Sequence, residues 1–193
     1  MLSMLDELVM KTPILLEALR LRDNDTYEHS LRVGKLAEDL AFFMKLPFKQ
    51  CRYIGCMGCL HDVGKIAVPD AILLKPGKLT DEEYEQMKRH SHEGSLLCIK
   101  VFGVDLPGVT YHHERWDSRG YPHQVGGDEI PIEARIVSVT DAFDAMTADR
   151  PYRAGMDPER AIAILREGAG AQWDPVVVRK FIEMWEVRGA AQL

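Results

Sequence analysis

The sequence predicts an all-α fold, and three observations support this prediction. Apolar residues recur at three- and four-residue steps in several long segments, which is the period of an amphipathic helix. Helix-start signals precede three of the later segments, and no series of alternating apolar and polar residues indicates a sheet. With 193 residues, 46% of them hydrophobic, the chain has the length of one domain and enough apolar side chains for a core.

The first helices are predicted in residues 1–20 and 26–45. Residues 1–20 are expected to form a connecting helix. Residues 26–45 carry an apolar stripe at helical spacing, and their helix should end before Pro47, which cannot continue it. The stripe consists of Val33, Leu36, Ala37, Leu40 and Phe43.

Two more helices are predicted in the middle of the chain. One begins near residue 49, ends at Gly64, and has a face made of Tyr53, Met57, Leu60 and His61. The next begins after Thr80, because Thr80 and Glu83 have the spacing of a capping box. Its stripe consists of Met87, His90, Gly94 and Leu97.

The last third of the chain starts with an irregular segment. Residues 116–131 are rich in glycine, proline and other turn residues, which predicts a short excursion rather than a helix. Residues 132–146 return to helical periodicity. Asp157-Pro158 and Asp174-Pro175 each combine an N-cap residue with proline at the first helical position, and they predict the last two helices.

The composition excludes several classes of function. The 24 Lys and Arg residues against 30 Asp and Glu give a net charge of −6, which argues against a long nucleic acid as partner. No apolar run approaches the roughly 18–20 residues that span a bilayer. Asp6 and Glu7 stand where a signal peptide would be basic. A soluble cytoplasmic protein that does not bind membranes is therefore expected.

The four cysteines also fit a reducing compartment. They are too few and too closely spaced for the disulfide framework of a secreted domain. Cys56-x-x-Cys59 raises the alternative of a zinc or redox site, but a structural zinc site needs a second ligand pair at matching spacing. The sequence has no such pair, so reduced and buried thiols are predicted.

Histidines and aspartates form the most informative pattern in the sequence. They lie on separate segments, at predicted helix ends or on apolar faces: His29, His61, Asp62, His90, His112, His113 and Asp141. Neutral imidazoles bind first-row divalent metals, and a carboxylate can bridge two of them, so these groups could together hold two ions. Mixed nitrogen and oxygen ligation favours iron, manganese, nickel or zinc over magnesium and calcium.

The alternative for any one of these residues is an ordinary structural role. A single His is commonly a packing group, the His61-Asp62 step could cap a helix end, and His112-His113 could lie in an exposed turn. His92 and His123 are interpreted in this ordinary way. The metal interpretation depends on the set, whose members are separated by loops rich in glycine and proline.

Ordered motifs along residues 15–185 resemble those of the HD-GYP family, a bacterial subgroup of the HD phosphohydrolases. They are His61-Asp62-Val63-Gly64-Lys65, His112-His113-Glu114, Gly120-Tyr121-Pro122 and Arg150-Pro151-Tyr152-Arg153. The resemblance implies an HD-domain bundle of about seven helices, with a short irregular excursion around the Gly-Tyr-Pro segment. It also implies that residues 1–20 connect to a single catalytic domain formed by residues 21–193.

The resemblance implies a centre of two or three divalent metals, with iron as the first expectation and manganese, nickel or zinc as alternatives. The family ligands match the same five histidines and two aspartates, and Asp62 is the residue that would bridge the metals. With Asp62, Lys65 is expected to be catalytic, because it matches the family lysine that adds positive charge near the attacked phosphate; a solvated lysine is the alternative. Tyr121, Arg150 and Arg153 match positions that line the substrate site.

Two residues depart from the family pattern. Family members with a third metal have a glutamate one turn before the first histidine, and here that position holds Asp25, which is one methylene shorter. A third-metal ligand and a helix N-cap are the two interpretations of Asp25. Ser118 stands where the family usually has glycine. Because serine resists the positive φ that glycine allows, the loop before Tyr121 is expected to be shaped differently.

The activity implied by the resemblance is hydrolysis of the bacterial messenger cyclic di-GMP to linear pGpG, and onward to GMP, through a hydroxide that bridges the metals. Two alternatives stay open. One is an HD phosphohydrolase for another cyclic dinucleotide. The other is a catalytically weak receptor or scaffold whose Gly-Tyr-Pro segment docks diguanylate cyclase (GGDEF) domains. Family members usually carry an upstream sensor or receiver domain, so a stand-alone protein and an excised domain both fit this sequence.

Overall fold

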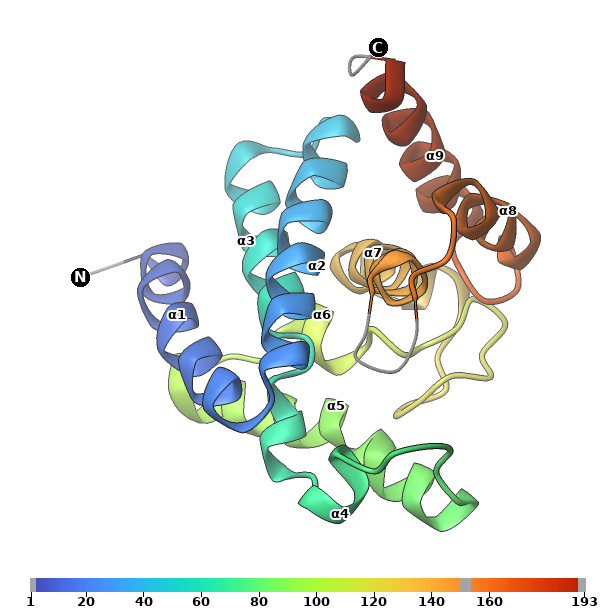
Figure 1. Cartoon of the computed structure of the whole chain (residues 1–193). Helices are drawn as coiled ribbons and strands as arrows, with labels where there is room; N and C mark the ends of the chain where they lie inside the picture. Colours follow the sequence, from blue (N-terminus) through green and yellow to red (C-terminus); the bar gives the residue numbers. More distant parts are fainter. Residues whose placement is uncertain (1–2, 150–153, 191–193) are drawn as a thin grey trace.

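A computed structural model describes residues 3–149 and 154–190, which contain nine α-helices and no β-strand (Figure 1). The α-helices are α1 (Met4–Arg22), α2 (Asn24–Phe43), α3 (Phe48–Leu60), α4 (Asp70–Leu73), α5 (Asp81–Phe102), α6 (Pro107–Thr110), α7 (Ile132–Thr147), α8 (Pro158–Gly168) and α9 (Pro175–Ala190). Two 3-10 helices accompany them, η1 (Val63–Ala67) and η2 (Gly127–Glu129). The all-α prediction is confirmed, and the long helices are the seven that remain when the four-residue α4 and α6 are set aside.

Local capping explains where several helices begin. The Thr80 hydroxyl accepts a hydrogen bond from the Glu83 amide at 3.3 Å, and the Glu83 carboxylate accepts one from the Thr80 amide at 2.7 Å. This is the predicted capping box of α5. The predicted caps of α8 and α9 form as well, because Asp157 and Asp174 each accept a backbone hydrogen bond from the residue two positions later.

Three helix boundaries differ from the prediction. Asp23 is the N-cap of α2 and accepts from the Asp25 amide at 3.1 Å, so the N-cap interpretation of Asp25 is wrong. The helix α3 ends at Leu60 instead of Gly64, and the chain then tightens into η1. The helix α1 extends to Arg22 and buries apolar residues against the bundle, so residues 4–22 take part in its packing; they include Leu8, Leu16 and Leu19.

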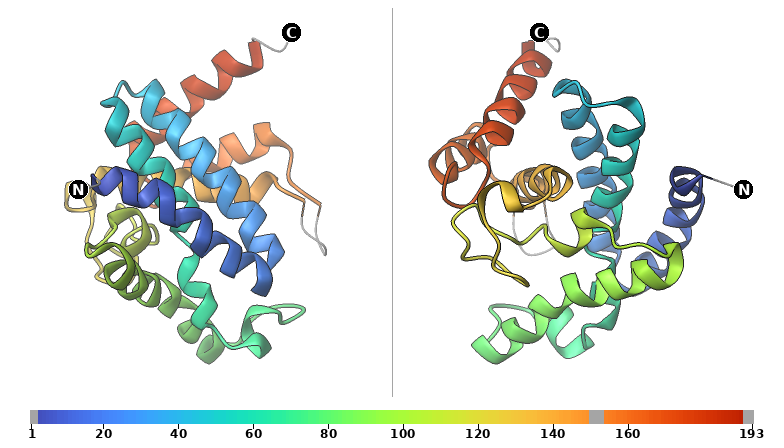
Figure 2. Two further views of the ribbon diagram at one scale, coloured as in Figure 1. Left: turned by 90° about the vertical axis from the view of Figure 1, so that its left-hand side faces the viewer. Right: turned by 180° about the vertical axis from the view of Figure 1, so that it is seen from behind.

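The helices α2 and α3 form an antiparallel pair in the middle of the molecule (Figures 1 and 2). They approach closely at Gly34 and Gly58. A Cβ atom at Gly58 would lie 2.9 Å from the Gly34 Cα, and one at Gly34 would lie 2.2 Å from the Cys59 Sγ. Any larger residue at either glycine would separate the two helices. This close packing brings the start of α2 next to the end of α3.

The remaining helices close the bundle on two sides. The helix α7 packs against α2. The helices α8 and α9 lie on the far side of α7, and α5 crosses the end of the bundle opposite the C-terminus (Figure 2). Fully buried residues of α7 and α9 join those of α2 and α3 in one core that includes Leu40, Ile54, Met57, Ile136 and Phe181. In the described residues no helix is both long and apolar enough to cross a membrane.

All four cysteines are free thiols, as predicted from their number and spacing. Cys51 and Cys98 are buried as predicted, but Cys56 and Cys59 are only half-buried, so the prediction of buried thiols is wrong for these two. Burial raises the pKa of Cys59 to about 12. A thiol with this pKa is protonated at neutral pH and does not act as a metal ligand or redox nucleophile.

Candidate metal centre

Seven polar residues from five parts of the chain meet at one end of the α2–α3 pair. His29 lies in the second turn of α2, His61 caps the end of α3, and Asp62 precedes η1. His90 comes from α5, His112 and His113 directly follow α6, and Asp141 comes from α7. These are the seven residues that the sequence pattern selected. Four of the histidines and Asp62 are almost completely buried, with side chains or residues no more than 8% exposed.

One group of ligand atoms consists of His29, His61 and Asp141. Asp141 Oδ1 lies 2.9 Å from His29 Nε2 and 3.7 Å from His61 Nε2. Each residue offers one ligand atom, and these atoms lie within 4.8 Å of one another. Two imidazoles and a carboxylate at this spacing can bind one divalent ion.

A second group consists of His90, His112 and His113. His90 Nε2 lies 3.2 Å from His112 Nε2 and 3.2 Å from His113 Nε2. The three nitrogens therefore converge on one point. Three imidazoles in this arrangement are a further ligand set for a divalent ion.

Asp62 lies between the two groups and contacts both. Its Oδ1 is 3.3 Å from His90 Nε2, and its Oδ2 is 3.4 Å from His61 Nε2. The two oxygens thus face different histidine groups. A carboxylate in this position can bridge two metal ions.

Hydrogen bonds at Nδ1 fix the orientation of four histidine rings. His61, His90 and His112 each donate from Nδ1 to the backbone carbonyl three residues earlier, at 2.7, 2.7 and 2.8 Å. His29 donates from Nδ1 to Asp144 Oδ2 at 2.7 Å. A ring that carries its proton on Nδ1 presents a free electron pair on Nε2, and in all four rings Nε2 points into the cluster.

These residues fit a pair of divalent cations. His61 Nε2 is buried and has no hydrogen-bond partner, although a buried ring nitrogen without one is costly. The Nε2 atoms of His90 and His112 meet at 3.2 Å with both rings donating elsewhere, so their lone pairs repel unless a cation lies among them. Both observations are explained by ligands arranged around cations.

Three histidines of the cluster are already in the form that binds metals. Burial lowers the pKa of His90, His112 and His113, and the pKa of His113 falls to about 3. These three rings are therefore neutral at pH 7, which is the form that binds metals. Burial opposes a charge on Asp62 as well, but nearby positive charge, chiefly that of Lys65, outweighs burial and holds the pKa of Asp62 well below its usual range. Asp62 therefore stays ionised. Although burial opposes it, the carboxylates in turn raise the pKa of His29 and raise that of His61 to about 10, so these two rings carry a second proton without an ion and release it when a metal binds.

Asp144 supports the cluster from outside, and sequence reasoning missed this role. Its carboxylate accepts from His29 Nδ1 at 2.7 Å, and from Arg32 Nε at 2.7 Å and Nη2 at 3.0 Å. It stands three residues after Asp141, one turn further along α7, so helical spacing alone could have suggested it. A carboxylate behind a metal-binding histidine fixes the ring and raises its basicity.

The other predicted site residues that the structure describes lie at different distances from the cluster. Lys65 Nζ donates to Asp62 Oδ2 at 2.6 Å, so this lysine lies beside the cluster and is not free in solvent. Asp25 is exposed in the first turn of α2 and belongs to neither ligand group. Arg150 and Arg153 lie outside the described residues. Ser118 adopts φ +62°, so the expectation that serine would reshape the loop by avoiding positive φ is wrong.

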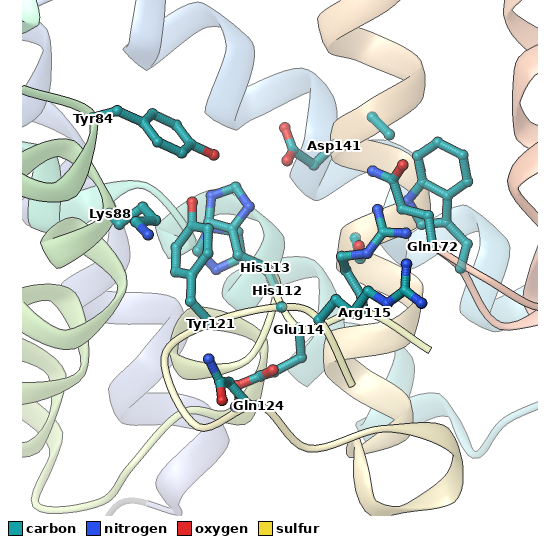
Figure 3. Close-up of a pocket in the computed structure, with 15 residues that line it drawn as sticks. Tyr84, Lys88, His112, His113, Glu114, Arg115, Tyr121, Gln124, Asp141 and Gln172 are labelled. Atoms are coloured by element: carbon teal, nitrogen blue, oxygen red, sulfur yellow. Dashed lines mark hydrogen bonds between the residues drawn. The ribbon is translucent and has the colours of Figure 1, made fainter. Parts of the chain in front are cut away.

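A cavity of about 480 Å³ opens onto this centre (Figure 3). Tyr84 and Lys88 lie on one side of it and Arg115 and Gln172 on the other, with His113 and Asp141 between the two sides. Tyr121, a predicted substrate residue, lines the cavity and stacks on His113 with ring centroids 4.7 Å apart. Sequence periodicity could not reveal the other walls, since they come from helices and loops far apart in the chain.

Known proteins resemble this chain in sequence and fold. Residues 13–177 match the family model of the HD domain. A Pseudomonas aeruginosa protein named as a cyclic di-GMP phosphodiesterase is 41% identical over 174 residues, covering 88% of this chain and 42% of the relative. A 3'3'-cGAMP-specific phosphodiesterase of Vibrio cholerae is 35% identical over 176 residues, covering 89% of this chain and 34% of the relative. The chain thus spans less than half the length of these curated relatives.

Solved structures share the fold. An HDG"Y"P protein from Bdellovibrio bacteriovorus aligns with a TM-score of 0.66 at 18% identity, over 82% of this chain and 51% of that one. Since the family model covers most of the sequence and the His61-Asp62 pair lies at the centre of the ligand cluster, the chain belongs to the HD domain family, as its resemblance to the HD-GYP proteins predicted.

Proposed function

We propose that this chain is a metal-dependent phosphodiesterase domain that hydrolyses cyclic di-GMP to linear pGpG, and onward to GMP. One observation carries the proposal: two ligand groups joined by Asp62 adjoin a cavity large enough for a nucleotide, and His112, His113 and Asp141 line it. The names of the Pseudomonas and Vibrio relatives support a cyclic dinucleotide as the substrate class.

Bound divalent ions would supply activation of a water molecule and neutralisation of the attacked phosphate. The residues of the chain hold and orient the reactants. His29, His61, Asp141 and the second histidine group would be the ligands, with Asp62 shared between the two ions. The Lys65 ammonium, 2.6 Å from Asp62, adds positive charge next to the bridging carboxylate, where a phosphate would bind. Tyr121 covers His113 and narrows the access of water to that side.

The ligand chemistry supports iron, manganese, nickel or zinc, because nitrogen and oxygen donors are mixed and thiolates are absent from the described site. Iron is the first choice on the resemblance to the HD-GYP family. A third ion held by Asp25 is a further part of the proposal. Asp25 is exposed, and its helix would have to present the carboxylate to a ligand position beyond His29.

Three further parts of the proposal concern the setting of the domain. The relatives' names include a 3'3'-cGAMP-specific enzyme, so a mixed cyclic dinucleotide is the second candidate substrate. Docking of GGDEF domains at the Gly-Tyr-Pro segment and control by an upstream sensor or receiver domain are the proposed partner relationships. A cytoplasmic location is supported by the four free thiols.

The test is a turnover assay with defined metals. The purified chain is loaded anaerobically with Fe(II) or Mn(II), incubated with cyclic di-GMP, and the nucleotides are separated over time. We expect linear pGpG to appear with Fe(II) or Mn(II) and not after chelation. His61→Ala should lose both bound metal and turnover, whereas His92→Ala, which removes an exposed histidine of α5, should retain both. Micromolar binding without turnover for every metal would refute the enzyme and favour a receptor.

A further inference from the structure

The wall of the cavity carries three cations, and two of them are already paired. Lys88 Nζ lies 2.5 Å from Glu85 Oε1. Arg115 donates to both oxygens of Asp117, at 3.0 and 2.8 Å. Within residues 3–149 and 154–190, Arg119 alone among the three has no ion pair and no side-chain hydrogen bond. Its charge is therefore available to a ligand of the cavity.

The backbone around Arg119 is held in place. The Arg119 amide donates to Asp117 Oδ1 at 3.2 Å. The neighbouring Gly120 is pressed against the chain, since a Cβ there would lie 2.4 Å from the Arg115 nitrogen. Further along the loop, Glu114 Oε1 accepts from the amides of His123 and Gln124 at 2.6 and 3.0 Å. A guanidinium presented from a fixed loop loses less entropy on binding than one on a mobile loop.

A cyclic dinucleotide brings two phosphodiesters into one cavity. On the proposed function, the phosphate that is attacked would lie at the candidate metal centre, whose residues His113 and Asp141 line the cavity (Figure 3). The second phosphate lies across the ring of the same molecule and needs its own positive charge, because a desolvated anion without a partner is costly. The positive charges of Lys88 and Arg115 are neutralised by Glu85 and Asp117, so these two side chains would bind the second phosphate less strongly.

We propose that Arg119 binds the phosphodiester of the cyclic dinucleotide that is not being hydrolysed. The guanidinium fork matches a phosphate, and such charge-assisted hydrogen bonds contribute roughly ten- to a hundredfold in affinity. This inference rests on the proposed function. It adds a residue that selects substrates with two phosphates over those with one.

The test compares two substrates on the same metal-loaded chain. Bis(p-nitrophenyl) phosphate has one phosphodiester and reports on the metal centre, whereas cyclic di-GMP has two. For Arg119→Met we expect kcat/KM for cyclic di-GMP to fall roughly tenfold or more beyond any fall for bis(p-nitrophenyl) phosphate, mainly through a higher KM. Arg119→Lys, which keeps the charge, should recover part of this loss. Arg160→Met, which removes an exposed arginine of α8, should change neither substrate.

The outcomes separate the inference from the function on which it rests. If the wild-type chain cleaves neither substrate, the proposed function fails. If it cleaves both and Arg119→Met lowers both equally, the function stands and the assignment of Arg119 is overturned. Equal losses in Arg119→Lys and Arg119→Met for cyclic di-GMP, with no loss of cyclic di-AMP binding, would show contact with guanine in place of phosphate and would also overturn it.

Discussion

Asp144 provides the sharpest prediction about how the protein prepares its metal site. Its carboxylate holds the proton of His29 on Nδ1 and so leaves the Nε2 electron pair free for an ion. The residue is only 4% exposed, so water cannot take over this hydrogen bond in a variant. Although burial raises the pKa of Asp144, hydrogen bonds from His29 and Arg32 outweigh it and hold that pKa below its usual value. The acceptor is therefore a carboxylate at neutral pH.

Replacing Asp144 should weaken metal binding in proportion to the acceptors that are lost. Asp144→Asn keeps an oxygen that can accept from His29, but it loses the negative charge and places an amide NH2 opposite Arg32 Nε, which now donates to Oδ1. We expect about tenfold weaker binding of the ion at His29, or about 1.4 kcal/mol. Asp144→Ala keeps no acceptor, frees the His29 ring, and should weaken binding about a hundredfold, or about 2.7 kcal/mol.

The assay is calorimetric titration of the metal-free chain with Mn(II), with bound metal counted by elemental analysis. Asp39→Ala is the matched control, since Asp39 also lies on a helix of the bundle and pairs with a lysine and an arginine, Lys35 and Arg188, away from the cluster. It should leave both affinities unchanged. Identical Mn(II) affinity in Asp144→Ala and the wild-type chain would refute the argument that Asp144 prepares His29.

Three further predictions concern packing and reactivity. Gly64→Ala should lower the free energy of unfolding in urea by about 3 kcal/mol, because the added Cβ would lie 1.9 Å from the His90 carbonyl oxygen; an unchanged midpoint would contradict this packing. Ser118→Gly should raise that free energy by roughly 0.5–1 kcal/mol, because Ser118 holds φ +62°, and a loss of stability would contradict the proposed strain. Burial raises the pKa of Cys59 and Cys98 to about 12, so iodoacetamide at pH 8 should label these thiols slowly in the native chain and quickly in urea. Mass spectrometry measures the labelling, and rapid labelling of the native chain would refute this prediction.

The elements with local signals could be predicted from the sequence. The capping box at Thr80 and the Asp-Pro steps before α8 and α9 are set by neighbouring residues, and the structure contains all of them. The start of α2 was misjudged because Asp23 and Asp25 are equally good capping residues, and only the backbone decides between them. The four-residue helices α4 and α6 were missed because they contain too few residues to show a period.

For the candidate site, too, one part could be predicted from the sequence and another could not. Its ligand residues could be selected from the sequence because their types and motifs carry the chemistry. The cavity could not, since Tyr84, Arg119 and Gln172 meet only after α5, the Gly-Tyr-Pro loop and the α8–α9 connection have packed together. The positive φ of Ser118 shows a further limit. Loop anchoring at Glu114 and Gly120 outweighs the intrinsic preference of serine.

The central claim is that two ions occupy the histidine and aspartate cluster, with Asp62 between them. Anomalous diffraction from a crystal of the chain loaded with Mn(II) tests it directly. We predict at least two peaks, one within ligand distance of the His90, His112 and His113 Nε2 atoms and one within ligand distance of His29, His61 and Asp141. A single peak, or ions bound only at surface carboxylates, would contradict the account.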